Sequence, residues 1–172
     1  MERRELIQLA AASALAVSPL AAAGKPPIFF TAPEYALLDE LCEVIMPADS
    51  EGPGAKAAAV RFYIDRMIGH ADGSIRDQWR AGLAAVDALA NARFGAALVK
   101  CTPAQRDQIV AAMAANEGHP KTPVERFFAP LKRMTFDGFV LSDTAKAGFF
   151  HYTGGHGIAE FAGCTHPEHR QV

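Results

Sequence analysis

The sequence has 172 residues, and its 17 Lys and Arg against 19 Asp and Glu give a formal net charge of -2. This near-neutral balance, without a Lys/Arg cluster, argues against nucleic-acid binding. The chain is long enough for one domain with a buried core. After the first 23 residues, no apolar run approaches the roughly 20 residues of a membrane-spanning helix.

The first 23 residues have the pattern of an export signal. Arg3 and Arg4 precede an apolar stretch, Leu9–Val17, and a small-residue cleavage site follows it. The paired arginines favour the twin-arginine route, which carries folded proteins into the periplasm. Because Glu2 stands where Ser or Thr is usual, a general secretory signal and an amphipathic first helix are the alternatives. We therefore predict a signal peptide and then one domain, residues 24–172.

Capping boxes predict where three helices begin in that domain. Each box places a Thr three residues before Glu or Gln, with Pro in the first turn: Thr31 and Glu34, Thr102 and Gln105, Thr122 and Glu125. In such a box the Thr side chain accepts from a first-turn amide, and the Glu or Gln accepts from the amide of the Thr. A further long helix is expected to begin at a cap provided by Ser74.

Apolar residues at helical spacing predict the buried face of each helix. The residues at these positions are Leu38, Leu41, Cys42, Ile45, Val60, Ile64, Met67, Ile68, Ile75, Trp79, Leu83, Val86, Leu89, Ala90, Ile109, Val110, Met113, Phe127, Phe128, Leu131, Met134 and Phe139. A shorter segment is expected beyond Ser142, through Phe149 and Phe150 to a break at Gly154–Gly155. Strand-like alternation is nearly absent. The sequence therefore predicts a single irregular all-α domain of about five to six helices with an extended C-terminal tail.

A turn-rich loop runs from Pro47 to Gly54 between the first two predicted helices. Its two prolines and two glycines would hold its shape at low entropic cost on binding. The acidic residues in it lack the spaced oxygen ligands of a calcium loop. The loop is either a rigid connection or a partner-contacting segment, and in the second case Pro47, Asp49 and Pro53 are the candidate contacts.

The adjacent residues Phe127 and Phe128 are further candidates for partner contact. Core packing is the simpler interpretation of aromatic residues at helical spacing. Because the two are neighbours in sequence, at least one ring is expected to point away from the main apolar stripe. A ring left over in this way is what an interface anchor would look like.

The motifs for the common catalytic and cofactor chemistries are missing. The sequence has no G-x-G-x-x-G, no Cys-x-x-Cys-His, no paired Cys-x-x-Cys and no Gly-x-Ser-x-Gly. We therefore predict no catalytic and no cofactor-binding residue in this chain. A small enzyme whose residues converge only in the fold is a weaker alternative.

The C-terminal tail suggests another alternative, a stand-alone periplasmic metal-binding protein. Cys164, His166 and His169 lie within six residues, and His151 or His156 could complete a set of ligands for zinc or copper. The spacing is tighter than in known four-ligand sites. A solvated or partner-contacting tail, touching a partner through Cys164 and His166, is therefore the preferred interpretation.

Cys42, Cys101 and Cys164 are the three cysteines of the chain. In an oxidising compartment an odd number leaves one thiol free or paired with another chain. Cys42 lies in an apolar helical run and is predicted to be a small buried hydrophobe. Cys164, in the polar tail, is the better candidate for a covalent link.

One long, irregular succession of residues is distinctive. It consists of Met46-Pro47-Ala48-Asp49, then Gly52-Pro53-Gly54-Ala55, then Tyr63-Ile64-Asp65, preceded by Phe30-Thr31 and Glu34. It resembles the gluconate 2-dehydrogenase subunit 3 family, which has a similar I-P-A-D, G-P-G-A and Y-I-D succession. The tail segment 163–169 also resembles an ending found in part of that family.

The resemblance implies a non-catalytic accessory subunit of a periplasmic FAD-dependent sugar, polyol or glycoside dehydrogenase. Its partner would be a large flavoprotein of the glucose–methanol–choline oxidoreductase type, which holds FAD and the catalytic histidine. Electrons would leave through an iron–sulfur cluster or a cytochrome c subunit. The small subunit would supply the export signal, with Arg3 and Arg4, and assist maturation of the large subunit, so that one leader moves two folded chains.

Overall fold

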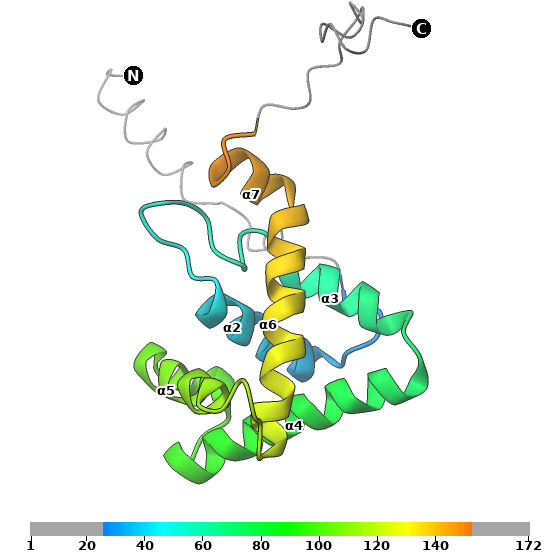
Figure 1. Cartoon of the computed structure of the whole chain (residues 1–172), viewed down its shortest axis with the longest axis vertical. Helices are drawn as coiled ribbons and strands as arrows, with labels where there is room; N and C mark the ends of the chain where they lie inside the picture. The colour runs from blue at the N-terminus through cyan, green and yellow to red at the C-terminus, as the bar shows by residue number, and fades with distance from the viewer. Residues whose placement is uncertain (1–25, 153–172) are drawn as a thin grey trace, which may run out of the picture.

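A computed structural model describes residues 26–152, and this part of the chain forms six α-helices and one short 3-10 helix, without strands (Figure 1). The elements are α2 (Ala32–Ile45), α3 (Val60–Gly69), α4 (Gly73–Phe94), η2 (Leu98–Lys100), α5 (Pro103–Ala114), α6 (Pro123–Leu141) and α7 (Asp143–Gly148). The predicted all-α class is confirmed. The predicted signal peptide and the C-terminal tail beyond residue 152 lie outside the described residues.

The three predicted capping boxes are present at the starts of α2, α5 and α6. In the first, the Thr31 side chain accepts from the Glu34 amide at 3.4 Å, and Glu34 Oε2 accepts from the Thr31 amide at 2.8 Å. The other two boxes repeat this arrangement. Each box satisfies amides that have no partner within the helix, so these helix starts are fixed locally by sequence.

The predicted start of α4 at Ser74 is wrong by two residues. Asp72 is the residue before the helix, and its carbonyl accepts from the amides of Ile75 and Arg76 at 3.0 Å each. The extended backbone at Asp72 turns the chain into the helix before Ser74 is reached. The helix ends at Phe94 and is capped by Gly95, whose φ of 68° is a left-handed conformation that glycine adopts without steric cost.

The core lies where α6 crosses the rest of the molecule. Figure 1 shows α6 running along the length of the domain, with α2, α3, α4 and α5 arranged around it, and α6 contacts each of them. Most predicted core residues are buried, among them Leu38, Leu41, Cys42, Ile64, Trp79, Leu83, Val86, Ile109, Met113, Leu131 and Phe139. This arrangement gives one helix contact with almost every part of the core.

Two residues predicted on buried stripes are exposed instead. Met67 retains 49% of its accessible surface and Ile75 retains 41%. The buried row of α3 is Val60, Ile64 and Ile68, spaced by four residues, and Met67 lies beside this row. Ile75 lies in the first turn of α4, one turn before the burial of that helix begins.

The short helix α7 ends earlier than the predicted segment beyond Ser142. Ser142 caps it by accepting from the Ala145 amide at 3.0 Å. The helix ends at Gly148, so Phe149 and Phe150 follow it rather than belonging to it. The predicted break at Gly154–Gly155 lies outside the described residues.

Candidate functional site

The loop from Pro47 to Gly54 is held in place by Glu43 of α2. Glu43 Oε1 accepts from the Ala48 amide at 3.3 Å, and Oε2 accepts from the Lys56 amide at 2.7 Å. A Cβ at Gly54 would lie 2.4 Å from the Ala48 nitrogen and 2.5 Å from Glu43 Oε1. Only glycine fits at this position, so the G-P-G-A part of the motif serves this close approach.

Asp49 closes the tip of the same loop. Its Oδ1 accepts from the amides of Glu51 at 2.8 Å and Gly52 at 3.2 Å. Pro47 and Asp49 are exposed, whereas Pro53 is half-buried against Gly148 of α7. The loop is therefore rigid, with Pro47 and Asp49 accessible. Contact of this loop with a partner stays a prediction.

Asp65 of α3, the last residue of the motif, is fully buried and binds the segment before α2. Its carboxylate accepts from the amides of Ile28 at 2.6 Å, Phe29 at 3.1 Å and Phe30 at 2.9 Å. These charge-assisted bonds join parts of the chain 35 to 37 residues apart. Asp65 is the one acidic residue of α3 and the last residue of the Y-I-D motif, and neither feature of the sequence identifies the three amides that it binds.

Asp39 of α2 and Arg61 of α3 form a second, partly buried polar contact, an ion pair between the two helices. The Arg61 guanidinium also lies 5.3 Å from the centroid of the Tyr35 ring. Burial raises the pKa of Asp39, and Arg61 opposes this shift. Asp39 Oδ1 has no hydrogen-bond partner in the structure. The pair connects α2 to the first turn of α3.

Three further carboxylates connect elements in the same manner. Glu40 pairs with Lys56 and Arg106, Glu125 accepts from the amides of Lys121 and Thr122 and from the Asn116 side chain, and Asp87 accepts from the Leu98 amide. Within residues 26–152, no group of three His, Cys, Asp or Glu side chains could hold a metal ion. The contacts of Glu40, Glu125 and Asp87 hold neighbouring elements together.

The metal candidates of the sequence are mostly beyond the described range. His151 is exposed and follows α7. His156, Cys164, His166 and His169 lie outside the described residues, as do the export residues Arg3 and Arg4. The metal-binding alternative therefore stays a prediction.

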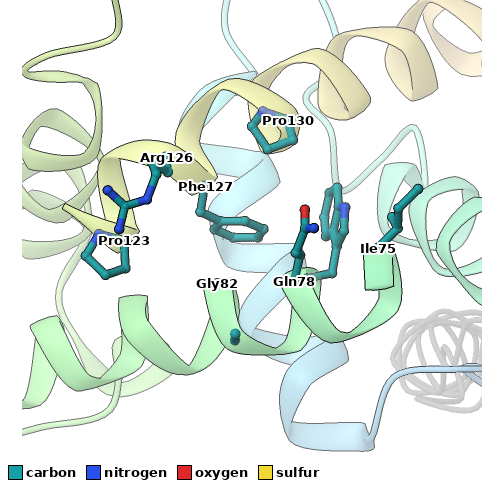
Figure 2. A pocket seen from close by; sticks show the side chains of 9 residues that line it. Ile75, Gln78, Gly82, Pro123, Arg126, Phe127 and Pro130 are labelled. Atoms are coloured by element: carbon teal, nitrogen blue, oxygen red, sulfur yellow. The ribbon is translucent and has the colours of Figure 1, made fainter. Parts of the chain in front are cut away.

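The expectation that Phe127 or Phe128 points away from the core is wrong. Both side chains are 6% exposed. Phe127 projects from α6 over Gly82 of α4 (Figure 2), and its ring meets Trp79 edge-on with the centroids 5.2 Å apart. Because α6 is surrounded by several helices, its buried face is wide enough for two adjacent rings. Contact of either ring with a partner stays a prediction.

An open apolar groove lies beside Phe127 between α4 and α6 (Figure 2). It has a volume of about 380 Å³, and Ile75, Gln78, Gly82, Pro123, Arg126 and Pro130 are among its lining residues. Pro130 lies inside α6 and has no amide hydrogen, so the Arg126 carbonyl lacks its usual donor four residues along the helix. Most of the residues that line the groove are apolar, and Gln78 and Arg126 are the polar ones.

The two cysteines of the described range are free thiols. Cys42 is fully buried, as predicted, and its sulfur accepts from Thr135 Oγ1 at 3.4 Å. Burial raises the pKa of the Cys42 thiol to about 12. Cys101 is also buried. Neither is positioned to link to another chain, and Cys164 lies outside the described residues.

The helices of residues 26–152 include none with the length and hydropathy needed to cross a membrane. The described part of the chain is a helical domain in which buried acids anchor loops and connect helices. The family model for gluconate 2-dehydrogenase subunit 3 matches residues 32–154. This match spans most of the chain, so the protein belongs to the gluconate 2-dehydrogenase subunit 3 family. No match was found among curated proteins or among solved structures.

The family match contains the whole I-P-A-D, G-P-G-A and Y-I-D succession on which the sequence resemblance depended. The tail segment 163–169 lies beyond it. The family is a subunit of a dehydrogenase, which implies a larger catalytic partner chain.

Proposed function

We propose that this chain is a non-catalytic accessory subunit of a periplasmic FAD-dependent sugar, polyol or glycoside dehydrogenase. It is needed for the export and maturation of the large flavoprotein subunit. FAD lies in that partner, and electrons pass from it to a cytochrome c, directly or through an iron–sulfur cluster. Family membership supports the association with a dehydrogenase.

The observation that carries the non-catalytic role is the use of the motif carboxylates. Asp65 binds three backbone amides, and Glu43 binds two on either side of the G-P-G-A turn. A carboxylate whose oxygens are occupied by backbone amides, as in the buried Asp65 and the half-buried Glu43, serves packing rather than proton transfer. Asp65 and Glu43 therefore hold the segment before α2 and the G-P-G-A turn in place.

A rigid domain of this kind can assist the large subunit by binding to it. A surface that binds only the folded form of the large subunit shifts that subunit toward its folded form by mass action. Obligate subunit interfaces commonly bury roughly 2,000 Å² or more. The leader of this chain, with Arg3 and Arg4, then exports both chains together after they have folded.

Replacement of the twin arginines tests this function. We expect Arg3→Lys with Arg4→Lys to retain both subunits in the cytoplasm, and deletion of this chain to leave the large subunit insoluble or unexported. Periplasmic dehydrogenase activity and immunoblots of both chains provide the measurement. Full soluble periplasmic activity without this chain would refute the proposal. Continued export of the large subunit alone would show that it has its own route.

A further inference from the structure

Large apolar side chains gather at one end of the domain without being covered. Phe136 is 54% exposed, Phe149 42%, Phe150 47% and Tyr152 55%. Val140 of α6 lies in the same helix row as Phe136, four residues on, and shares a surface hollow with Phe150 and Tyr152. We call these five residues the aromatic end surface.

The backbone holds this surface in a defined shape. The Tyr152 amide donates to the Lys146 carbonyl at 2.7 Å, which folds the chain back onto α7. The Phe149 ring meets the rings of Phe139 and Phe150 edge-on, with centroids 5.8 Å and 5.1 Å away. The exposed rings are therefore attached to the core through Phe139, which is buried.

The aromatic end surface adjoins the motif loop. A Cβ at Gly52 would lie 3.1 Å from Phe149 Cδ2, so the loop and the residue after α7 are in direct contact. Figure 1 shows this loop and α7 at the same end of α6, and α4 at the opposite end. The exposed rings and the exposed loop residues Pro47 and Asp49 thus form one continuous end of the molecule.

The size of the surface indicates a protein partner. Four half-exposed aromatic side chains present roughly 400 Å². Apolar patches of this size on a folded domain are often interaction sites. The aromatic end surface supplies about half of the roughly 800 Å² that each partner contributes to a standard interface. The adjoining motif loop adds further surface.

The segment after Tyr152 has little apolar sequence with which to cover these rings, and the apolar leader is assigned to export under the proposed function. Ile158, Phe161 and Val172 are the large aliphatic or aromatic residues after Tyr152, among many Gly, His and charged residues. The family, by contrast, implies a larger catalytic partner. We therefore infer that the aromatic end surface is the docking site for the large dehydrogenase subunit. This inference rests on the proposed function.

Competition inside the cell tests the inference. The large subunit is produced together with two copies of this chain that carry different tags, one wild type and one with Phe150→Ser and Tyr152→Ser. Both side chains are about half exposed and neither belongs to the buried core, so the variant is expected to fold. We expect the wild-type tag to recover at least ~10-fold more large subunit than the variant tag. Ile75→Ser, an exposed apolar residue on α4, is the matched control and should compete equally.

The outcomes separate this inference from the proposed function. If neither tag recovers the large subunit, the proposed function fails and the inference falls with it. If both tags recover the large subunit equally, the docking site is wrong and the proposed function stands.

Hydroxyl-radical labelling of Phe150 and Tyr152 provides a second measurement. We expect strong labelling in the isolated chain and protection in the complex. Protection in the isolated monomer would assign the surface to another segment of the same chain and overturn the inference. Protection in a dimer of the isolated chain would assign it to a second copy, with the same consequence.

Discussion

The ring of Phe127 occupies the space that a side chain at position 82 would need. A Cβ built on Gly82 would lie 2.3 Å from Phe127 Cδ2. The ring is buried and packed against Trp79, and its Cγ would lie 2.4 Å from the same Cβ, so rotation of the ring alone cannot relieve the clash. Gly82 is therefore the contact point at which α6 lies on α4, and it sits inside a helix where alanine has the higher intrinsic propensity.

We predict that Gly82→Ala destabilises the protein by about 1–3 kcal/mol, because overpacking outweighs the helix propensity gained. Gly73→Ala is the matched control. The nearest atom to its Cβ would be Arg76 Nη2 at 3.9 Å, so this variant should be neutral or slightly stabilised. Urea unfolding measures both free energies. A Gly82→Ala variant as stable as Gly73→Ala would contradict the close packing of α4 and α6.

We predict that Asp65→Asn lowers the free energy of unfolding by about 2–4 kcal/mol. The asparagine oxygen is a weaker acceptor than the carboxylate, and its NH2 group cannot accept from the backbone amides of Ile28, Phe29 and Phe30. Faster hydrogen exchange at Ile28, Phe29 and Phe30 should accompany the loss. Asp137→Asn, which removes an exposed pair with Arg133, should change stability by less than ~0.5 kcal/mol. Equal stability of the two variants would show that the Asp65 contacts are dispensable.

The stability of the α6 start is expected to depend on pH through Glu125. The Lys121 amide, the Asn116 side chain and the Thr122 amide lower the pKa of Glu125 below its usual value of 4.5. An acid with a lowered pKa in the folded state stabilises the fold above its unfolded pKa, and this contribution disappears as the pH falls through the folded pKa. The stability difference between wild type and Glu125→Gln should therefore shrink as the pH falls below the usual carboxyl value of 4.5. Urea titrations at several pH values measure it, and a constant difference would contradict the contacts.

The Cys42 thiol is expected to resist modification in the folded protein. Its pKa of about 12 leaves almost no thiolate near pH 8, and it has no access to solvent. Mass spectrometry after brief treatment with iodoacetamide should find Cys42 unmodified in native protein and modified in urea. Rapid labelling without denaturant would indicate that the packing of α2 on Thr135 opens readily.

Local sequence determined which parts of the fold could be predicted. The capping boxes of Thr31, Thr102 and Thr122 contain both hydrogen-bonding partners within four residues, so three helix starts were predicted correctly. The start of α4 was missed because Asp72 marks it by its extended backbone, without a side-chain cap.

The roles of single residues could not be predicted from the sequence, because they depend on contacts between segments that are far apart in the chain. The acceptors for Ile28, Phe29 and Phe30 lie on Asp65, and the space for Phe127 comes from Gly82 on another helix. The exposure of the aromatic rings after α7 could not be predicted from the sequence either. Helical spacing does not show that the helix ends at Gly148.

The most direct test of an accessory role is purification of this chain from the periplasm of cells that also produce the large subunit. We predict that a tag on this chain recovers a complex whose visible spectrum is that of bound flavin, with both polypeptides in a fixed ratio. Recovery of this chain alone, as a monomer without flavin absorption, while an active dehydrogenase remains in the unbound fraction, would contradict the account.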